Sequence, residues 1–308
     1  TVGVFVSQST IQTLLNQLSQ VLLGKPEQIK LAVACILAKG HLLIEDLPGM
    51  GKTSLSQGIA SSLGMSYQRI QFTSDMLPAD ILGVSIYSKE QQQFIFHKGP
   101  IFNQMLLADE INRASPKTQS ALLEAMAEQQ ITIDGITHPL SSPFFVIATQ
   151  NPVDQAGTFP LPESQLDRFM MRISIGYPSA EAELAMLKSR TQANKPASLS
   201  QCLTPQELML LQQQVAQVSA SDAVLNYLIA LVDFSRQHNV ANGLSPRASI
   251  ALLQAAKAWA FINQRQYVVP EDIQAVFASV AEHRIRSSSQ FQGQALSDTI
   301  LASVNPIR

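Results

Sequence analysis

Short apolar runs alternate with amphipathic stretches along residues 1–193 of the chain. Mostly apolar runs without polar alternation are typical of strands that are buried on both faces of a parallel sheet. The pattern therefore predicts an α/β domain over 1–193, in which helices flank a parallel sheet. The strand-like runs are HLLIE ending at Glu45, YQRIQF ending at Phe72, MLLAD ending at Asp109, FFVIAT ending at Thr149 and, more weakly, RISI ending at Ile175.

The pattern changes after Tyr177-Pro178. The segment NKPASLSQ, residues 194–201, has the composition of a linker. Beyond it, the segment Thr204-Pro205-Gln206-Glu207 is a capping box with proline at the first helical position, and Ser245-Pro246 and Val269-Pro270 open further helices in the same way. We therefore predict a smaller all-α domain over 202–308.

Composition limits the kind of protein this is. Apolar residues make up 46% of the 308 and charged residues 14%, which predicts a globular chain. The net charge is −2, and no run of like charges suggests the basic face of a dedicated nucleic-acid binder. We expect no nucleic-acid partner from these features.

Two cysteines, Cys35 and Cys202, lie too far apart in sequence to suggest a disulfide framework or a metal site. Cys35 lies in the apolar run LAVACILA and is predicted to be a core residue. Reduced thiols favour a cytoplasmic location. The stretch TVGVFVSQST lacks the charge and cleavage pattern of a secretory leader, and no run approaches the ~18 apolar residues of a membrane span, so we expect no membrane insertion.

The first chemical motif, DLPGMGKT from Asp46 to Thr53, directly follows the first strand and precedes an amphipathic helix. Inward-facing N–H groups and a helix N-terminus bind phosphate, a lysine reaches the β- and γ-phosphates, and a hydroxyl binds Mg²⁺. The strict pattern has glycine where this chain has Asp46, at the strand exit, and we expect the loop to tolerate the change. A chance turn is the alternative, which the flanking strand and helix disfavour. The predicted nucleotide-binding residues are Pro48, Gly49, Met50, Gly51, Lys52, Thr53 and Ser54.

Polar side chains end two later strands. Asp109 and Glu110 follow MLLA, where the first carboxylate would hold Mg²⁺ together with Thr53, and the second would orient or deprotonate the attacking water. Solvated acids at a strand end are the simpler interpretation of this pair alone. Asn151, in ATQNP, would contact the γ-phosphate and the water, although Asn-Pro also forms turns.

These motifs together resemble an AAA+ ATPase, and longer phrases resemble the MoxR family. The phrases are GPIFNQMLLADEINRASPKTQSALLEAMAEQQITIDG (99–135), ATQNP, and LPESQLDRFMMR ending at Arg172. The resemblance implies a P-loop AAA+ core followed by a small all-α lid, with ATP and Mg²⁺ as ligands. It also implies roles by position: Lys52 and Thr53 as the Walker A pair, Asp109 and Glu110 as the Walker B pair, Asn151 as sensor 1, Arg168 as the arginine finger and Arg247 as sensor 2.

The two arginines are unremarkable without the resemblance, which implies that Arg168 reaches the ATP of a neighbouring subunit. Arg247 falls in the first turn of a predicted helix, where the macrodipole disfavours a cation and a phosphate would compensate. We expect ATP to lie between the α/β domain and the lid, with Arg247 coupling the angle of the lid to the nucleotide.

Two insertions also look similar to those of the MoxR, magnesium chelatase and helicase branch. Residues 73–98 resemble a helix-2 insert, and residues 130–137 form a hairpin signal around Asp134-Gly135, before sensor 1. Related helicases carry basic residues on this hairpin to hold DNA. The acidic tip at Asp134 argues against a nucleic-acid motor.

The resemblance implies a homo-oligomer, a hexameric ring by family expectation, that hydrolyses ATP to remodel or activate a partner protein, often one with a von Willebrand A domain. Three alternatives stay open: a nucleic-acid motor, disfavoured by charge; the ATPase subunit of a metal chelatase, which shares both inserts; and a nucleotide-gated binding switch. A bacterial transcription activator is disfavoured because its GAFTGA signature is missing.

Overall fold

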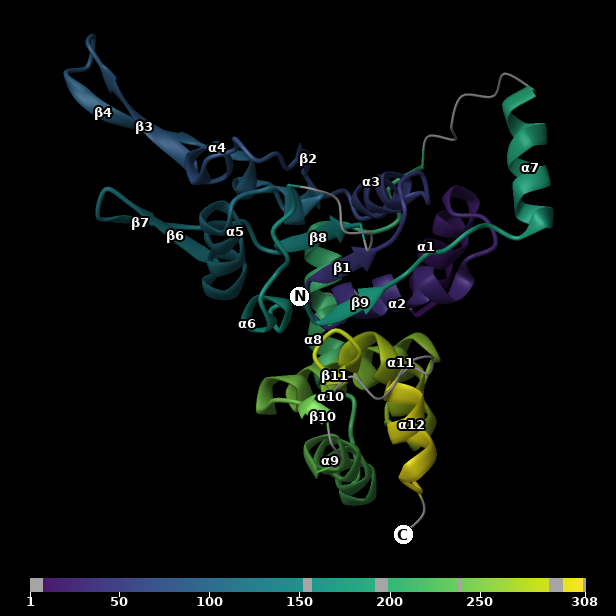
Figure 1. Cartoon of the computed structure of the whole chain (residues 1–308). Helices are drawn as coiled ribbons and strands as arrows, with labels where there is room; N and C mark the ends of the chain where they lie inside the picture. The colour runs from purple at the N-terminus through teal and green to yellow at the C-terminus, as the bar shows by residue number, and fades with distance from the viewer. Residues whose placement is uncertain (1–7, 152–156, 192–198, 238–239, 288–295, 307–308) are drawn as a thin grey trace, which may run out of the picture.

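A five-stranded parallel sheet forms the centre of the protein (Figure 1). The computed structural model describes residues 8–151, 157–191, 199–237, 240–287 and 296–306. All five predicted strands are present, in the spatial order β2-β5-β8-β1-β9. Their bounds are β1 Leu42–Glu45, β2 Tyr67–Gln71, β5 Met105–Asp109, β8 Phe145–Gln150 and β9 Met171–Ile173. The parallel pairing brings the carboxyl ends of all five strands to one edge.

The strand β2 departs from the expected apolar pattern because it lies at the edge of the sheet. Gln68, Arg69 and Gln71 are exposed, while Ile70 is buried. The central strands β5 and β8 are buried throughout, apart from the last residue of β8. Polar residues within a strand-like run therefore indicate an edge position here.

Alternate residues of the central strands face two separate hydrophobic clusters. In β5, Met105 and Leu107 face one cluster, whereas Leu106 and Ala108 face the other. Helices α1 (Gln8–Val21), α2 (Pro26–Leu37) and α3 (Lys52–Ser62) contribute to the first cluster. Helices α4 (Pro78–Leu82) and α5 (Pro116–Glu128), with the short η1 (Pro100–Phe102) and η2 (Ile111–Arg113), contribute to the second. The sheet is thus the middle of three layers.

Two antiparallel hairpins project from the same side of the molecule, the first within the expected helix-2 insert and the second at the expected hairpin (Figure 1). The first is β3 (Gly83–Ser88) with β4 (Gln93–Lys98), and the second is β6 (Gln130–Ile133) with β7 (Ile136–Pro139). Asp134 and Gly135 both have positive φ at the tip of the second hairpin, as a tight two-residue turn requires. The Phe96 ring stacks on His138 with 4.4 Å between centroids, which joins the two hairpins near their bases.

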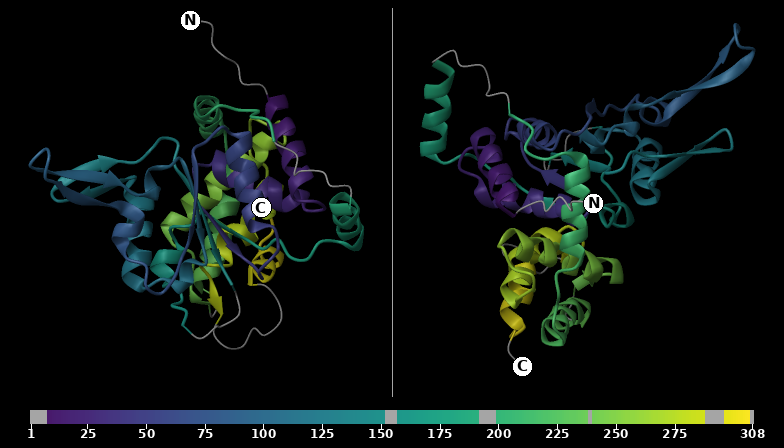
Figure 2. Two further views of the ribbon diagram at one scale, coloured as in Figure 1. Left: turned by 90° about the horizontal axis from the view of Figure 1, so that it is seen from above. Right: turned by 180° about the vertical axis from the view of Figure 1, so that it is seen from behind.

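The chain after β9 is largely helical. Helices α6 (Glu163–Leu166) and α7 (Ala180–Thr191) flank β9 in sequence, and α7 lies away from the rest of the molecule (Figure 2). The lid contains α8 (Pro205–Ala216), α9 (Asp222–Gln237), α10 (Pro246–Ile262), α11 (Pro270–Ala281) and α12 (Leu296–Ser303), plus the short pair β10 (Val240–Asn242) and β11 (Arg286–Ser287). The predicted linker falls mostly on residues 194–198, outside the described residues. None of the described helices is long and apolar enough to cross a membrane.

Two of the three predicted helix starts of the lid have a capping hydroxyl, whereas at the third the Asp272 carboxylate accepts the Val269 N–H. The Thr204 hydroxyl accepts the Glu207 N–H, and the Glu207 carboxylate accepts the Thr204 N–H. The Ser245 hydroxyl accepts the Ala248 N–H at the start of α10. Each such cap is worth ~1 kcal/mol of helix stability.

The lid packs directly on the α/β domain. Residues of α8, α10 and α11 belong to the same hydrophobic cluster as α2 and β1. At this junction the buried Arg284 donates to the Asp167 carboxylate at 2.7 Å and to the Phe169 carbonyl at 2.7 Å. The carbonyls of Met170 and Val280 accept from the same guanidinium. A buried cation with these acceptors holds the lid to the segment that precedes β9.

We expect Arg284→Ala to destabilise the fold by about 3–5 kcal/mol, because it removes the donor of the Asp167 carboxylate and of three carbonyls at this junction. Urea unfolding followed by the fluorescence of Trp259, the single tryptophan, measures the loss. The matched control is Arg236→Ala, which removes an exposed ion pair to Asp233 and one hydrogen bond to the Leu244 carbonyl and should cost about 1–2 kcal/mol. Equal effects of the two substitutions would contradict this assignment of Arg284.

A buried histidine lies at the start of β1. His41 contacts the rings of Phe144 and Phe145, and its Nδ1 accepts the Val146 N–H at 3.0 Å. Burial lowers the pKa of His41 to about 4, against a smaller opposing effect of a backbone hydrogen bond with Met126. Between this value and the ordinary 6.5, the unfolded chain binds a proton that the folded chain does not, so protonation favours unfolding.

We therefore expect the free energy of unfolding to fall by up to about 3 kcal/mol from His41 as the pH drops from 7 to 4. Burial also lowers the pKa of His283, which adds an effect of the same sign. Urea unfolding at several pH values measures the slope. The slope should become shallower in His41→Asn and stay unchanged in His97→Asn, whose ring is exposed. An unchanged slope in His41→Asn would show that other groups carry the acid sensitivity.

Candidate functional site

The loop between β1 and α3 leaves room for an anion. Gly49 and Gly51 have φ of +85° and +87°, in the left-handed region that glycine adopts without steric cost. An added Cβ on Gly51 would come within 2.8 Å of Leu22 Cδ1, whereas one on Gly49 would meet no described atom within 4 Å. Among the described side chains, none caps the start of α3. Uncapped N–H groups beside open space suit a phosphate.

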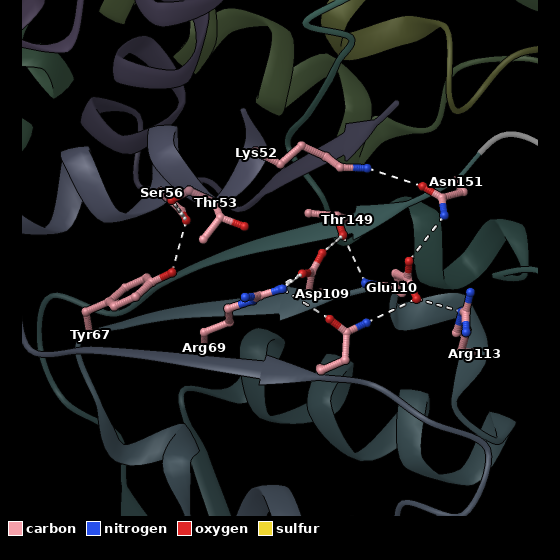
Figure 3. Close-up of polar contacts among 11 residues, drawn as sticks. Lys52, Thr53, Ser56, Tyr67, Arg69, Asp109, Glu110, Arg113, Thr149 and Asn151 are labelled. Carbon is pink, nitrogen blue, oxygen red and sulfur yellow. Dashed lines mark hydrogen bonds and ion pairs between the residues drawn. The ribbon is translucent and has the colours of Figure 1, made fainter. Parts of the chain in front are cut away.

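The other predicted loop residues differ in exposure. Pro48 and Ser54 are exposed, and Met50 packs partly against the first hydrophobic cluster. These residues therefore offer mainly main-chain groups to a ligand. Thr53 is half-buried, and Figure 3 shows its hydroxyl directed toward the strand ends, on the side where Asp109 lies.

Lys52 extends from the first turn of α3 into the centre of the site. Its Nζ donates to the Asp46 carbonyl at 2.7 Å and to Asn151 Oδ1 at 3.3 Å. Burial lowers the pKa of Lys52, while the carboxylates of Asp109, Asp46 and Glu110 oppose that shift. The ammonium is thus held between the phosphate loop and the end of β8.

Asp109, at the end of β5, is held by both neighbouring strands. Its Oδ1 accepts the Thr149 hydroxyl of β8 at 2.6 Å, and its Oδ2 pairs with the Arg69 guanidinium of β2 at 2.6 Å. The buried Thr149 hydroxyl also accepts the Glu110 N–H at 2.9 Å. One hydroxyl thereby fixes the side chain of the first acid and the main chain of the second.

Glu110 turns the chain out of the sheet with φ +56° and ψ +50°, an uncommon backbone conformation for a residue with a Cβ. Its Oε1 accepts the Asn151 amide at 3.3 Å. Its Oε2 accepts the Gln71 amide at 3.1 Å and pairs with Arg113 at 2.6 Å. Residues from β2, from the end of η2 and from the position after β8 therefore orient this carboxylate (Figure 3). Strained backbone of this kind is often found at functional sites.

Four of the predicted site residues form one network: Lys52 contacts Asn151, Asn151 contacts Glu110, and Thr149 links Glu110 to Asp109. Sequence reasoning missed Arg69, Gln71, Arg113 and Thr149. Arg69 and Gln71 could have been found from the sequence. They lie two residues apart in a strand-like run, so their side chains share one face, and polar side chains on such a face need hydrogen-bond partners.

The donors at this edge match Mg²⁺, which prefers oxygen ligands and usually binds through one or two protein groups plus phosphates and water. Thr53 and Asp109 are the candidate ligands. In the described part of the chain, no cluster of three or more His, Cys, Asp and Glu residues could hold a metal by itself. The site thus fits a metal that arrives with a nucleotide.

Arg168 and Arg247 do not lie at this edge. Both line a cavity of about 280 Å³ together with Lys39, Gly40 and His41. Those three residues precede β1, whereas the phosphate loop follows it, so the cavity lies at the amino edge of the sheet and the loop at the carboxyl edge. The four residues of β1 separate the two by ~13 Å at 3.3 Å per residue. The structure brings the two arginines together and keeps both away from Lys52.

The two arginines are held differently. The Arg168 guanidinium donates to the Leu123 carbonyl of α5 at 2.8 Å. Arg247 is exposed in the first turn of α10, as expected, where the macrodipole disfavours its charge. An anion bound at this cavity would relieve that effect.

A larger cavity lies elsewhere. A hollow of about 640 Å³ lies between the two hairpins and is lined by Leu82, Val84, Phe94 and Ile133, among others. Its apolar lining lacks the cations that a nucleotide needs. The carboxyl edge of the sheet remains the better candidate for chemistry.

Comparisons with known proteins identify the family of the chain. The model of the ATPase family associated with various cellular activities (AAA) matches residues 41–171, and that of the AAA lid domain matches 235–304. YeaC of Bacillus subtilis is 46% identical over 90% of this chain and 88% of its own length. The chaperone MoxR1 of Mycobacterium tuberculosis is 37% identical over 92% of this chain and 77% of its own.

A solved structure of a candidate ATPase from Cytophaga hutchinsonii has a TM-score of 0.89 and 37% identity, and the match covers 97% of this chain and 95% of that one. The family models match both parts of the chain, the α/β domain and the lid. The chain is a member of the MoxR family of AAA+ ATPases.

Proposed function

We propose that this protein hydrolyses ATP within a homo-oligomer and uses the cycle to remodel, assemble or activate partner proteins. The observation that carries the proposal is the single network of Lys52, Asn151, Glu110, Thr149 and Asp109 beside an open, glycine-containing loop. These side chains supply, within one site, a phosphate-binding cation, a metal-binding carboxylate and a water-orienting pair.

In the proposed reaction, the amides of the loop and Lys52 bind the phosphates of ATP. Thr53 and Asp109 hold Mg²⁺, which supplies neutralisation of charge on the phosphate oxygens when it is bound. The Glu110 carboxylate accepts a proton from the attacking water, and Asn151 fixes the direction of that carboxylate. Arg113 and Gln71 hold its other oxygen, which limits the rotation of the side chain.

The positions of Arg168 and Arg247 support a site completed by a second copy of the chain. Both line one cavity at the amino edge, so neither contacts the phosphate loop of its own subunit. We infer that both arginines serve the ATP of a neighbouring subunit. This departs from our expectation that Arg247 acts on the nucleotide of its own chain. A hexameric ring is the family expectation for the assembly.

The partner is proposed from the family, whose relative MoxR1 is named a chaperone. A client protein with a von Willebrand A domain is the expected partner. A metal-chelatase motor subunit and a slow, nucleotide-gated switch are the alternatives.

We expect the ATPase rate per subunit to rise with protein concentration, and Arg168→Ala to lower it by about 10³-fold or more, the scale of in-trans arginine fingers. Glu110→Gln should also be inactive. Mixing the two inactive variants creates interfaces in which an intact Arg168 faces an intact Glu110, so the mixture should recover part of the rate.

The control is Lys117→Ala, which removes an exposed cation from α5 and should leave the rate unchanged. A rate that is independent of concentration, together with no recovery on mixing, would place the finger within one subunit. If the wild-type protein binds ATP but hydrolyses it at a rate near zero, the alternative of a nucleotide-gated switch would be favoured.

A further inference from the structure

The most unusual residue of the phosphate loop is Asp46, where the strict motif has glycine. Its side chain is buried, with 6% of the residue exposed. One carboxylate oxygen accepts the N–H groups of Ile175 at 2.6 Å and Gly176 at 2.7 Å, and the Ser174 hydroxyl at 3.3 Å. The other oxygen accepts the Leu47 N–H at 3.0 Å. This carboxylate is therefore fully engaged by hydrogen-bond donors.

The donors lie just past the end of a strand. The pairing of β1 with β9 ends at Ile44 and Ile173, after which residues 174–176 leave the sheet. Gly176 has φ +66° and turns the chain toward α7. The carboxylate of Asp46 thus extends the contact between β1 and β9 beyond the last ladder pair, to the base of the phosphate loop.

The main chain of Asp46 is fixed as well. Its N–H donates to the Gln150 carbonyl of β8 at 3.2 Å, and its carbonyl accepts Lys52 Nζ at 2.7 Å. The residue is therefore tied on one side to β8, on the other to the segment after β9, and across the loop to Lys52. A glycine would keep the main-chain contacts and lose every side-chain contact.

We propose that Asp46 is a positioning residue that clamps the base of the phosphate loop to residues 174–176. The clamp fixes the Asp46 carbonyl, and through it the Lys52 ammonium, in the position from which the lysine meets phosphate. Main-chain N–H groups that donate to a carboxylate form strong, charge-assisted hydrogen bonds, which suits them to this role. The inference rests on the proposed function of the loop as the ATP site.

An adjacent residue provides a matched control. Glu45 also links β1 to β9, through an ion pair with Arg172 at 2.6 Å, and it accepts the Gln150 amide at 2.9 Å. Its contacts are side chain to side chain, and none reaches residues 174–176. If Asp46 merely strengthened the edge of the sheet, then Glu45→Gln and Asp46→Asn would have similar consequences.

The test compares Asp46→Gly, Asp46→Asn and Glu45→Gln with the wild type. Asp46→Gly should raise the KM for ATP and the dissociation constant of a fluorescent ADP analogue about tenfold, the effect of losing ~1.4 kcal/mol. Its kcat should fall much less. Asp46→Asn keeps one acceptor oxygen and should show a smaller effect, and Glu45→Gln should leave the KM unchanged.

Hydrogen exchange without nucleotide tests the clamp independently of turnover. The amides of Ile175 and Gly176 should exchange about tenfold faster or more in Asp46→Gly, while the amide of Ile44 stays protected. If Asp46→Gly does not fold, the exchange of Asp46→Asn decides the question. A wild-type KM and unchanged exchange in the folded variant overturn the proposal. Faster exchange in a protein that does not hydrolyse ATP would leave the clamp standing and reject the ATPase function.

Discussion

The parallel pairing of β1, β5 and β8 is the constraint on which the rest of the site depends. In a parallel sheet every strand delivers its C-terminal residue to the same edge, so residues far apart in sequence meet there. Lys52 follows β1, Asp109 and Glu110 end β5, and Asn151 follows β8. The hydrogen bonds of Thr149 and Asn151 then turn this proximity into one connected network. A slip of one residue in the pairing of β5 with β8 would move Thr149 away from both acids.

The same sheet sets how the lid is placed. One face of the central strands shares a hydrophobic cluster with α2, α8, α10 and α11, so the lid is packed on the body of its own subunit. Arg284 strengthens this junction because its donors reach the Asp167 side chain and the carbonyls of Phe169 and Met170. Asp167 directly precedes Arg168, and the Ser245 hydroxyl beside Arg247 donates to Asp167 at 3.4 Å. The contacts that attach the lid are therefore also the contacts that surround the two arginines.

Much of this architecture could be predicted from the sequence, for identifiable reasons. The strands β1, β5 and β8 are short apolar runs, and the helices of the lid begin with proline and a capping residue, so local signals and structure agree. The second hairpin could be predicted from its Asp134-Gly135 turn, and the first falls in the segment that resembles a helix-2 insert. The spatial order of the strands could not be predicted from these local patterns, because they carry no information on which strand lies beside which.

The residues of the candidate site likewise fall into those that could be predicted from the sequence and those that could not. Lys52, Asp109, Glu110 and Asn151 could be named because each terminates or follows an apolar strand in a recognisable phrase. Arg69 and Gln71 were missed because β2 looked like a buried strand, and only the edge position explains their polar side chains. The carboxylate of Asp46 looked like a tolerated exception, since its donors come from residues 174–176, more than a hundred positions away.

The separation of the two edges has a consequence for how the oligomer works. Arg168 and Arg247 lie at the amino edge, so in the proposed ATPase they would reach a nucleotide at the carboxyl edge only from a second copy in head-to-tail contact. Strand β9 links the two edges within a subunit: Arg168 lies three positions before it, and the donors to Asp46 follow it. A movement of β9 relative to β1 would therefore shift Arg168, the proposed finger, and the base of the phosphate loop at once. In the proposed ring, this three-residue strand at the edge of the sheet, held to β1 on one side, would be the element best placed to couple successive sites.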